Sequence, residues 1–145
     1  MYFISTESRA GRIIPTLKRL ELTDSSMVEV PLVEGIEELN IEYGIDNDND
    51  GNPDAYTADP TNYTYPGCIT CAAANNWTNV VTAHLYILAR SVDPSPGYAD
   101  TKTYSLGRDA TGNAVTVGPK NDGYRRRVYT ALVRIVNPAG RRDRP

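Results

Sequence analysis

The residues of this chain whose types and spacing best suit chemistry lie in one short acidic stretch. Polar oxygen-bearing residues recur there at every second position, with a glycine at the sixth: Asp46, Asp48, Asp50, Gly51, Asn52 and Asp54. This spacing matches the front part of an EF-hand-type calcium loop, in which alternating side chains point inward. Without a cation, carboxylates so close together would repel one another. The sequence therefore predicts Ca²⁺ bound by residues 46–54.

The loop departs from an EF-hand at its far end and in its flanks. Thr57 stands where a bidentate Glu is usual, and the neighbouring segments read as a strand and a Pro-containing loop instead of two helices. We therefore expect a shortened loop in which Asn52 offers its backbone carbonyl and Asp54 closes the site. Water or a later acid such as Asp59 would complete it. The alternative is a solvated acidic turn without an ion, and Mg²⁺ fits less well because it resists dehydration.

Cys68 and Cys71 form the second motif, a C-x-x-C pair. Zinc would need two more soft ligands, and the chain offers only His84. A thioredoxin-like redox site would need a βαβ setting, which the pattern does not show. The favoured interpretation is a structural disulfide that closes a loop tip in an oxidising compartment, where extracellular calcium loops also occur.

The sequence offers few sets of residues that could form a catalytic site. His84 is the only histidine, so no Ser-His-Asp or Cys-His arrangement can be built, and a lone histidine on a strand is more often structural. There is no glycine-rich phosphate loop. The best-clustered acids already belong to the predicted calcium loop, although a glycosidase pair elsewhere stays open. We expect a protein that is not an enzyme.

Strands must position both motifs, because the chain is rich in Tyr and β-branched residues and carries many Gly and Pro. Leu39, Ile41, Tyr43 and Ile45 alternate with polar residues, which predicts a strand with one face buried. For residues 77–90 a helix competes with the favoured strand. The final strand is apolar on both faces, so we expect it to lie centrally in a sheet. The expected strands are 2–7, 16–22, 39–45, 77–90, 102–106, 114–117 and 124–136.

The polar stretch 46–76 would be unusually long for a structureless loop, so we expect the acidic cluster and the cysteines to tie it down. The 145 residues otherwise suit a single domain, 1–145. A net charge of −3 argues against a nucleic-acid partner. Arginines crowd the last stretch, where we expect them to face water: Arg125, Arg126, Arg127, Arg134, Arg141, Arg142 and Arg144.

Two features of the sequence bear on whether further residues precede Met1 in the natural protein. No apolar run reaches the length of about 18 residues that a membrane span requires. The segment after Met1 already reads as a strand, with no signal peptide. We therefore expect upstream sequence to be missing, and localisation must be inferred from other features.

Three blocks of the chain resemble the PilW family of type IV pilus minor pilins. They are residues 33–46, which run straight into the Asp-Gly loop, residues 77–91 beginning Trp-Thr-Asn-Val-Val, and residues 122–137, which contain the final strand. The blocks come in the family's order and span about residues 30 to 140.

The resemblance implies the fold class and the function. Such proteins are pilin-like α+β subunits, related to the GspJ-like pseudopilins, in which a long N-terminal helix packs on an antiparallel β-sheet head. Here the cleavage motif and that helix are absent, so the chain would be a mainly β head domain, monomeric by itself. The family implies a non-catalytic role in pilus assembly or initiation, with other minor and major pilins as partners. It would reside in the periplasm and inner membrane, anchored by the missing helix, and later in the extracellular pilus.

Two rival functions remain open on the sequence alone. One is a calcium-dependent extracellular adhesion or carbohydrate-binding β domain, whose composition would look the same and whose tyrosines would form the binding surface. The other is a periplasmic redox or hydrolytic enzyme. The upstream gene sequence would separate the pilin from the adhesion domain, because a pilin needs a leader peptide and an apolar helix.

Overall fold

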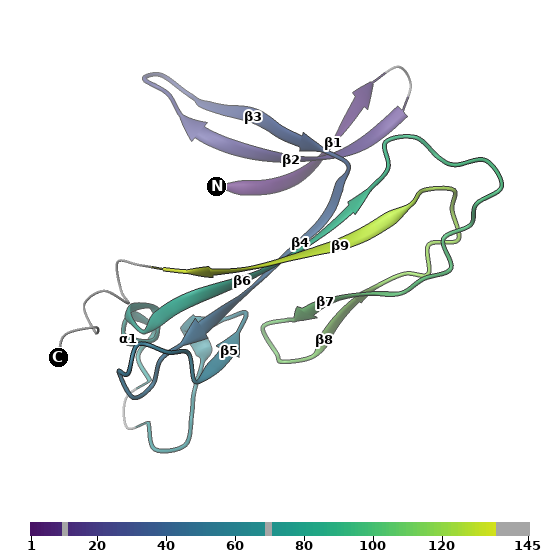
Figure 1. The fold of residues 1–145 in the computed structure, drawn as a ribbon. Coiled ribbons are helices and arrows are strands. Elements are labelled where there is room, and N and C mark those ends of the chain that lie inside the picture. Colours follow the sequence, from purple (N-terminus) through teal and green to yellow (C-terminus); the bar gives the residue numbers. More distant parts are fainter. Residues whose placement is uncertain (10–11, 69–70, 136–145) are drawn as a thin grey trace. The chain divides into compact units, whose positions relative to one another are not determined.

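A computed structural model describes residues 1–9, 12–68 and 71–135 of the chain, and strands dominate its secondary structure (Figure 1). The paired strands whose register is resolved are antiparallel, as the sequence predicts. The strands among the described residues are β1 (Tyr2–Arg9), β2 (Arg12–Leu22), β3 (Met27–Glu34), β4 (Ile36–Ile45), β5 (Ala55–Thr57), β6 (Val80–Arg90), β7 (Tyr104–Arg108), β8 (Ala114–Val117) and β9 (Arg126–Arg134). Two short helical segments accompany them, the 3₁₀ turn η1 (Pro60–Asn62) and the helix α1 (Ala73–Thr78).

Strands β1, β2 and β3 form one sheet in chain order. Tyr2 pairs with Arg19 across β1 and β2, and Leu17 pairs with Val33 across β2 and β3. This confirms the two strands expected at 2–7 and 16–22. The Ala10-Gly11 part of their expected connection lies outside the described residues.

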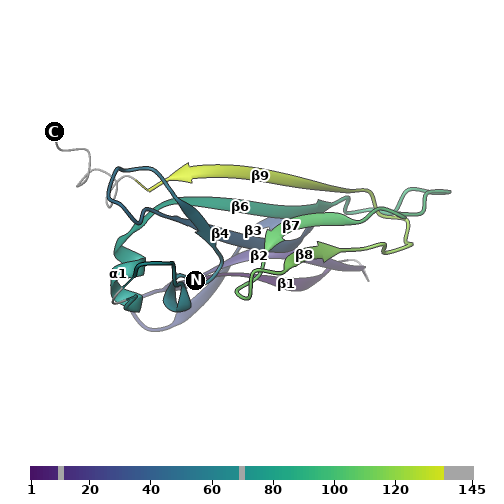
Figure 2. The ribbon, with the colours of Figure 1, turned by 90° about the horizontal axis from the view of Figure 1, so that it is seen from below.

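A second sheet has the strand order β5-β4-β6-β9, and β7 pairs with β8 in a third. Figure 2 shows β4, β6 and β9 running side by side. The prediction of a strand, and not a helix, is confirmed for residues 80–90. The β-branched residues at the start of β6 favour this extended backbone. The preceding residues, including Trp77, form α1 instead.

Two expectations about these strands are wrong. Strand β9 lies at the end of the second sheet as described, not at its centre. Its apolar side chains are largely exposed, with Leu132 at 61%. In β4 the buried positions include Glu42 and Gly44, which alternation had placed on the polar face. A Cβ on Gly44 would come within 2.1 Å of the Thr82 hydroxyl oxygen, so close packing, not polarity, decides that position.

The stretch 46–76 is more ordered than a plain loop. It contains β5 and η1 and ends in α1. Strand β5 pairs with the end of β4, where Ile45 faces Ala55. Asn76 donates hydrogen bonds from Nδ2 to the backbone oxygens of Pro60 and Tyr63, both at 2.8 Å. One buried amide therefore ties η1 to α1.

The described residues fall into two compact units, each of which is treated by itself. Unit 1 comprises Met1–Leu39, Ile87–Leu106 and Thr116–Tyr129. Unit 2 comprises Asn40–Tyr86, Gly107–Val115 and the described part of Thr130–Pro145. The assignment of 1–145 to a single domain stays a prediction.

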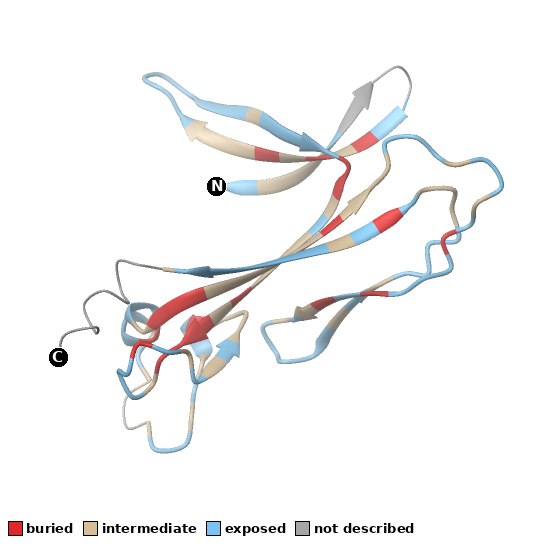
Figure 3. Cartoon of the chain, viewed as in Figure 1, coloured by how far each residue is buried: buried red, intermediate tan, exposed pale blue. Residues whose placement is uncertain are grey.

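Each unit has its own buried apolar side chains (Figure 3). In unit 1 these are Ile14, Ile36, Leu88, Tyr104 and Leu106, and in unit 2 they are Ile45, Val80 and Val81. None of the helices among the described residues has the length and apolar character needed to cross a membrane.

Candidate metal centre

The acidic loop begins where β4 leaves the core of unit 2. Ile45 is buried, and the next residue, Asp46, has no exposed surface. The Asp46 N–H donates to the backbone oxygen of Asn79 at 2.9 Å, immediately before β6 begins. The Asp54 N–H returns to the backbone oxygen of Ile45, also at 2.9 Å. These bonds close the loop on the strand that carries it.

The Asp46 carboxylate organises the interior of the loop. Its Oδ1 accepts the Asn49 N–H at 2.6 Å, and its Oδ2 accepts the Gly51 N–H at 3.0 Å. Both donors have a positive φ, 68° for Asn49 and 89° for Gly51. Gly adopts that backbone at little cost and Asn tolerates it better than most residues, which explains both residue types. The loop therefore curls tightly around one buried carboxylate.

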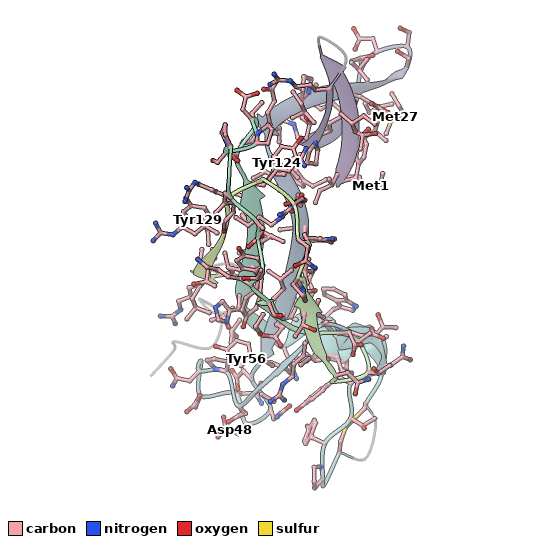
Figure 4. All side chains as sticks on the ribbon, turned by 90° about the vertical axis from the view of Figure 1, so that its right-hand side faces the viewer. Met1, Met27, Asp48, Tyr56, Tyr124 and Tyr129 are labelled. Atoms are coloured by element: carbon pink, nitrogen blue, oxygen red, sulfur yellow. A yellow bond between two sulfur atoms is a disulfide. The ribbon has the colours of Figure 1, made fainter. Side chains whose placement is uncertain are left out.

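Asp48 and Asp50 complete a cluster with Asp46. Both are exposed, and Figure 4 shows the Asp48 side chain at the outer edge of the loop. Each accepts a backbone N–H from two residues further on, Asp48 from Asp50 at 3.1 Å and Asp50 from Asn52 at 2.7 Å. One carboxylate oxygen of each of the three residues lies within 4.8 Å of the others.

That spacing fits a calcium ion. Calcium binds oxygen at about 2.3–2.6 Å, so two ligands on one ion lie at most about 5.2 Å apart. The three oxygens satisfy this limit before any rearrangement. Carboxylates are also the hard ligands that calcium prefers. Asp46, Asp48 and Asp50 are therefore the residues that could hold the predicted ion.

The other two predicted ligands have different positions. Asp54 lies outside the three-carboxylate group, and its Oδ2 accepts the Asn47 N–H at 2.7 Å. Asn52 is exposed, and its carbonyl as a ligand stays a prediction. Asp59, the suggested later acid, caps η1 by accepting the Thr61 N–H at 3.0 Å. A hydrogen bond from the Asn62 side chain is the main reason that the pKa of Asp59 lies below its ordinary value.

Cys68 and Cys71 form the expected disulfide, with their Cα atoms 5.8 Å apart. The Cys68 N–H donates to the backbone oxygen of Tyr65 at 3.2 Å, across a turn that contains Gly67 at a φ of 91°. Helix α1 begins two residues after Cys71. The disulfide therefore joins the last residue of this turn to a residue just before α1.

Sequence reasoning missed a polar chain around His84 in unit 2. The Tyr86 hydroxyl donates to Glu42 Oε2 at 2.8 Å and lies 3.0 Å from His84 Nδ1. Which of Tyr86 and His84 Nδ1 donates in the second contact depends on the tautomer of His84. Burial, together with the Glu42 hydrogen bond, raises the pKa of Tyr86 to about 12. The Arg108 N–H satisfies the other oxygen of Glu42 at 3.0 Å.

Sequence reasoning also missed a buried ion network in unit 1. The Arg126 side chain is 1% exposed, so the expectation that this arginine faces water is wrong. Its guanidinium holds Glu37 through two hydrogen bonds, at 2.5 and 3.0 Å. It also holds Asp122 at 2.6 and 2.7 Å and Asp100 at 3.0 Å. Asp122 is only four residues away, but Glu37 and Asp100 lie 89 and 26 residues from Arg126, so no local pattern signals the whole network.

The ion network shifts the pKa values of its members. The hydrogen bonds that Arg126 donates, above all to Asp122, raise the pKa of Arg126. The Arg126 hydrogen bonds hold the pKa of Asp122 below its ordinary value. Burial by itself would raise the pKa of Asp100, but hydrogen bonds from Arg126 and Tyr104 outweigh it and lower the pKa. Tyr104, which donates to Asp100 at 2.9 Å, has its pKa raised to about 12, chiefly by burial. The charged forms of Arg126, Asp100 and Asp122 are thus stabilised in the fold.

The comparison with protein families decides the family. The sequence model described as "Type IV Pilus-assembly protein W", or PilW, matches residues 1–137. The chain belongs to the PilW family. It is therefore a protein related to type IV pilus assembly, and components of the pilus are its expected class of partner. The match extends the resemblance of the three sequence blocks over β1, β2 and most of β3, which those blocks do not cover.

Two further comparisons gave no relatives of this PilW chain. A search of curated proteins and a search of solved structures each found no match.

Proposed function

We propose that this PilW chain is the head domain of a non-catalytic minor pilin that takes part in the assembly or initiation of type IV pili. The observation that carries the proposal is the family match over residues 1–137. The antiparallel, strand-dominated fold agrees with a β-rich pilin head. The non-catalytic role rests on the family and on the chemistry of the chain, whose single histidine is held against Tyr86.

The proposal includes a pilin-like architecture for the whole protein. A long N-terminal helix would anchor the protein in the inner membrane, with this head in the periplasm, and would enter the pilus core after assembly. Other minor and major pilins would then be the partners, and the isolated head would be a monomer. The upstream gene should encode a leader peptide followed by about 20 apolar residues, the length of a membrane span. A conventional cleaved signal peptide in that place would contradict this architecture.

The proposal also includes a structural calcium ion in the loop 46–54. Asp46, Asp48 and Asp50 would bind it, together with the Asn52 carbonyl and Asp54. The support is the 4.8 Å grouping of three carboxylates at the spacing of a calcium loop. When bound, the ion supplies positive charge that offsets the repulsion among these carboxylates. Its role would be to hold the loop on the end of β4, not to sense calcium.

A genetic complementation experiment tests the proposed function. Deletion of the gene should abolish or strongly reduce surface pili, counted by electron microscopy and measured as pilin in the sheared fraction. The full-length wild-type gene should restore them. The doubly substituted gene Asp48→Asn, Asp50→Asn should restore fewer, whereas Arg127→Met, which alters an exposed arginine, should restore them fully. Normal pili in the deletion strain would contradict the role in assembly.

A further inference from the structure

A cavity of about 420 Å³ opens beside the acidic loop, wholly within unit 2. The acidic loop forms one wall of the cavity, and the turn 65–68 forms a second. Helix α1 and the residue after it, Asn79, form the third wall. The side chains that matter for recognition are Asn47, Asn49, Tyr65, Asn75, Asn76 and Asn79. Its volume falls within the range of about 300–1,000 Å³ that is usual for small-molecule sites.

The described residues that line the cavity carry no charge. Its lining consists of five asparagines together with Thr78, Tyr65, Gly67 and Cys68. A phosphate or carboxylate ligand would find no Lys or Arg on these walls, and a cationic ligand would find no carboxylate. The lining is also too polar for the apolar ligands that fill most pockets. This leaves a neutral ligand that is rich in hydrogen-bonding groups.

The amides are suited to hydroxyl groups in particular. A side-chain amide offers both a donor and an acceptor, as a hydroxyl does, so one Asn can bind two neighbouring hydroxyls. Among the described residues, the exposed side chains of Asn49 and Asn75 form no hydrogen bond and are available to a ligand. Asn76 is instead fixed in the wall by its two backbone acceptors. The cavity therefore combines rigid and available amides.

Tyr65 gives the cavity an aromatic face. Its ring is stacked on that of Tyr63, with centroids 6.0 Å apart and planes inclined by 27°. Tyr63 is held in turn by the Asn47 side chain, which donates to its hydroxyl at 3.3 Å. An aromatic ring has an apolar face that can pack against the C–H groups of a ligand. A ligand that has hydroxyl groups around its edge and C–H groups on its face would match this cavity, and a sugar ring has both.

We propose that this cavity is a binding site for a neutral saccharide, with Asn49 and Asn75 binding hydroxyl groups and Tyr65 packing on the ring. The site goes beyond a role in assembly, because it would give the pilus-associated protein an affinity for glycans. It uses the walls of the calcium loop but none of the three clustered carboxylates. Saccharide binding by the isolated chain can therefore fail while the role in pilus assembly holds, and the reverse is equally possible.

Nuclear magnetic resonance titration of the chain in saturating calcium tests the site. The probes are glucose, galactose, mannose and N-acetylglucosamine, each also as a β-linked disaccharide. We expect at least one probe to give saturable shifts of the Asn49 and Asn75 side-chain amides and of the Asn76 backbone amide, and the Asn76 amide reports binding in the variants. The double substitution Asn49→Gly, Asn75→Ala should raise the dissociation constant of that probe at least about five-fold. Glycine is chosen at position 49 because it keeps the positive φ accessible.

Matched variants make the result decisive. Tyr65→Ala should abolish the shifts, Tyr65→Phe should retain them because the ring remains, and Asn113→Ala, outside the cavity, should bind as the wild type does. The proposal is overturned if no probe saturates, or if the Asn49→Gly, Asn75→Ala variant binds as tightly as the wild type. Tighter binding of a neutral trialanine peptide at the same resonances would also overturn it, since that would identify a peptide site.

Discussion

Each unit of the PilW chain gathers three carboxylates, but the two clusters balance their charge differently. In unit 1, Glu37, Asp100 and Asp122 surround Arg126, whose guanidinium is buried with them. In unit 2, backbone N–H groups of the loop donate to Asp46, Asp48 and Asp50. Asp48 and Asp50 form no ion pair among the described residues. The first cluster contains its own cation, whereas we propose that the second receives one as a bound ion.

The difference also separates what the two clusters do for the fold. A buried guanidinium with several carboxylates fixes the positions of segments far apart in the chain, because losing one member leaves an uncompensated charge. A cluster that depends on an external ion is stable only when that ion is present in sufficient concentration. Unit 1 should therefore be stable regardless of calcium, and the loop of unit 2 should not.

The largest expected effect comes from removing the internal cation. Arg126→Met should lower the free energy of unfolding by about 3–5 kcal/mol, because three carboxylates then lose their counter-charge in a largely buried site. Urea denaturation at neutral pH measures the change. Arg127→Met is the matched control, since this neighbour is exposed and lies over the Tyr129 ring, and it should cost less than about 1 kcal/mol. Equal effects of the two substitutions would mean that burial of Arg126 does not matter.

The next effect separates the anchor of the loop from its exposed acids. Asp46→Ala should cost about 2 kcal/mol even without calcium, because two backbone N–H groups lose their acceptor. Asp48→Asn should cost less than about 0.5 kcal/mol under the same conditions, since its side chain is exposed. Urea denaturation in a chelator gives both values. If Asp48→Asn proved as costly as Asp46→Ala, the division of roles within the loop would be wrong.

The smallest effect is a dependence of stability on pH, which comes from the unit 1 cluster. The folded pKa values of Asp100 and Asp122 lie below the ordinary value of 3.8, so their contribution to stability is present above that pH. It is lost as the pH falls from 3.8 through the lowered folded values. The stability gap between the wild type and Arg126→Met should therefore shrink from about pH 7 to about pH 3, as unfolding at intermediate pH values would reveal. A constant gap would exclude these carboxylates as its cause.

The two clusters also show how far the sequence can lead. Calcium binding by the loop of unit 2 stays a prediction. The grouping of Asp46, Asp48 and Asp50 could be predicted, because these residues alternate along one short stretch and Gly51 marks the turn. The network of unit 1 could not, because Arg126 is 89 residues from Glu37 and 26 from Asp100. A local charge pattern predicts that such an arginine is solvent-exposed, because the pattern does not include partners from distant parts of the chain.

The strands likewise have some features that depend on the local sequence and others that depend on distant residues. Most of their positions could be read from β-branched residues and alternation. The position of β9 at the end of its sheet and the burial of Glu42 depend on neighbours from elsewhere in the chain. Glu42 is satisfied by Tyr86 and by the Arg108 N–H, 44 and 66 residues away. The cavity proposed to bind saccharides is likewise assembled from three segments, none of which signals a site by itself.

Isothermal titration of calcium into chelator-stripped protein tests most directly whether the loop of unit 2 receives an external cation. The wild type should bind one calcium ion with a dissociation constant of about 1 mM or below, as calcium loops of extracellular modules do. Calcium at 100 times that constant should raise the free energy of unfolding by about 2.7 kcal/mol. Asp48→Asn combined with Asp50→Asn should abolish binding, whereas Asp59→Asn should not. No heat and no stabilisation at about 10 mM calcium, or an equal loss in the Asp59→Asn variant, would contradict the account.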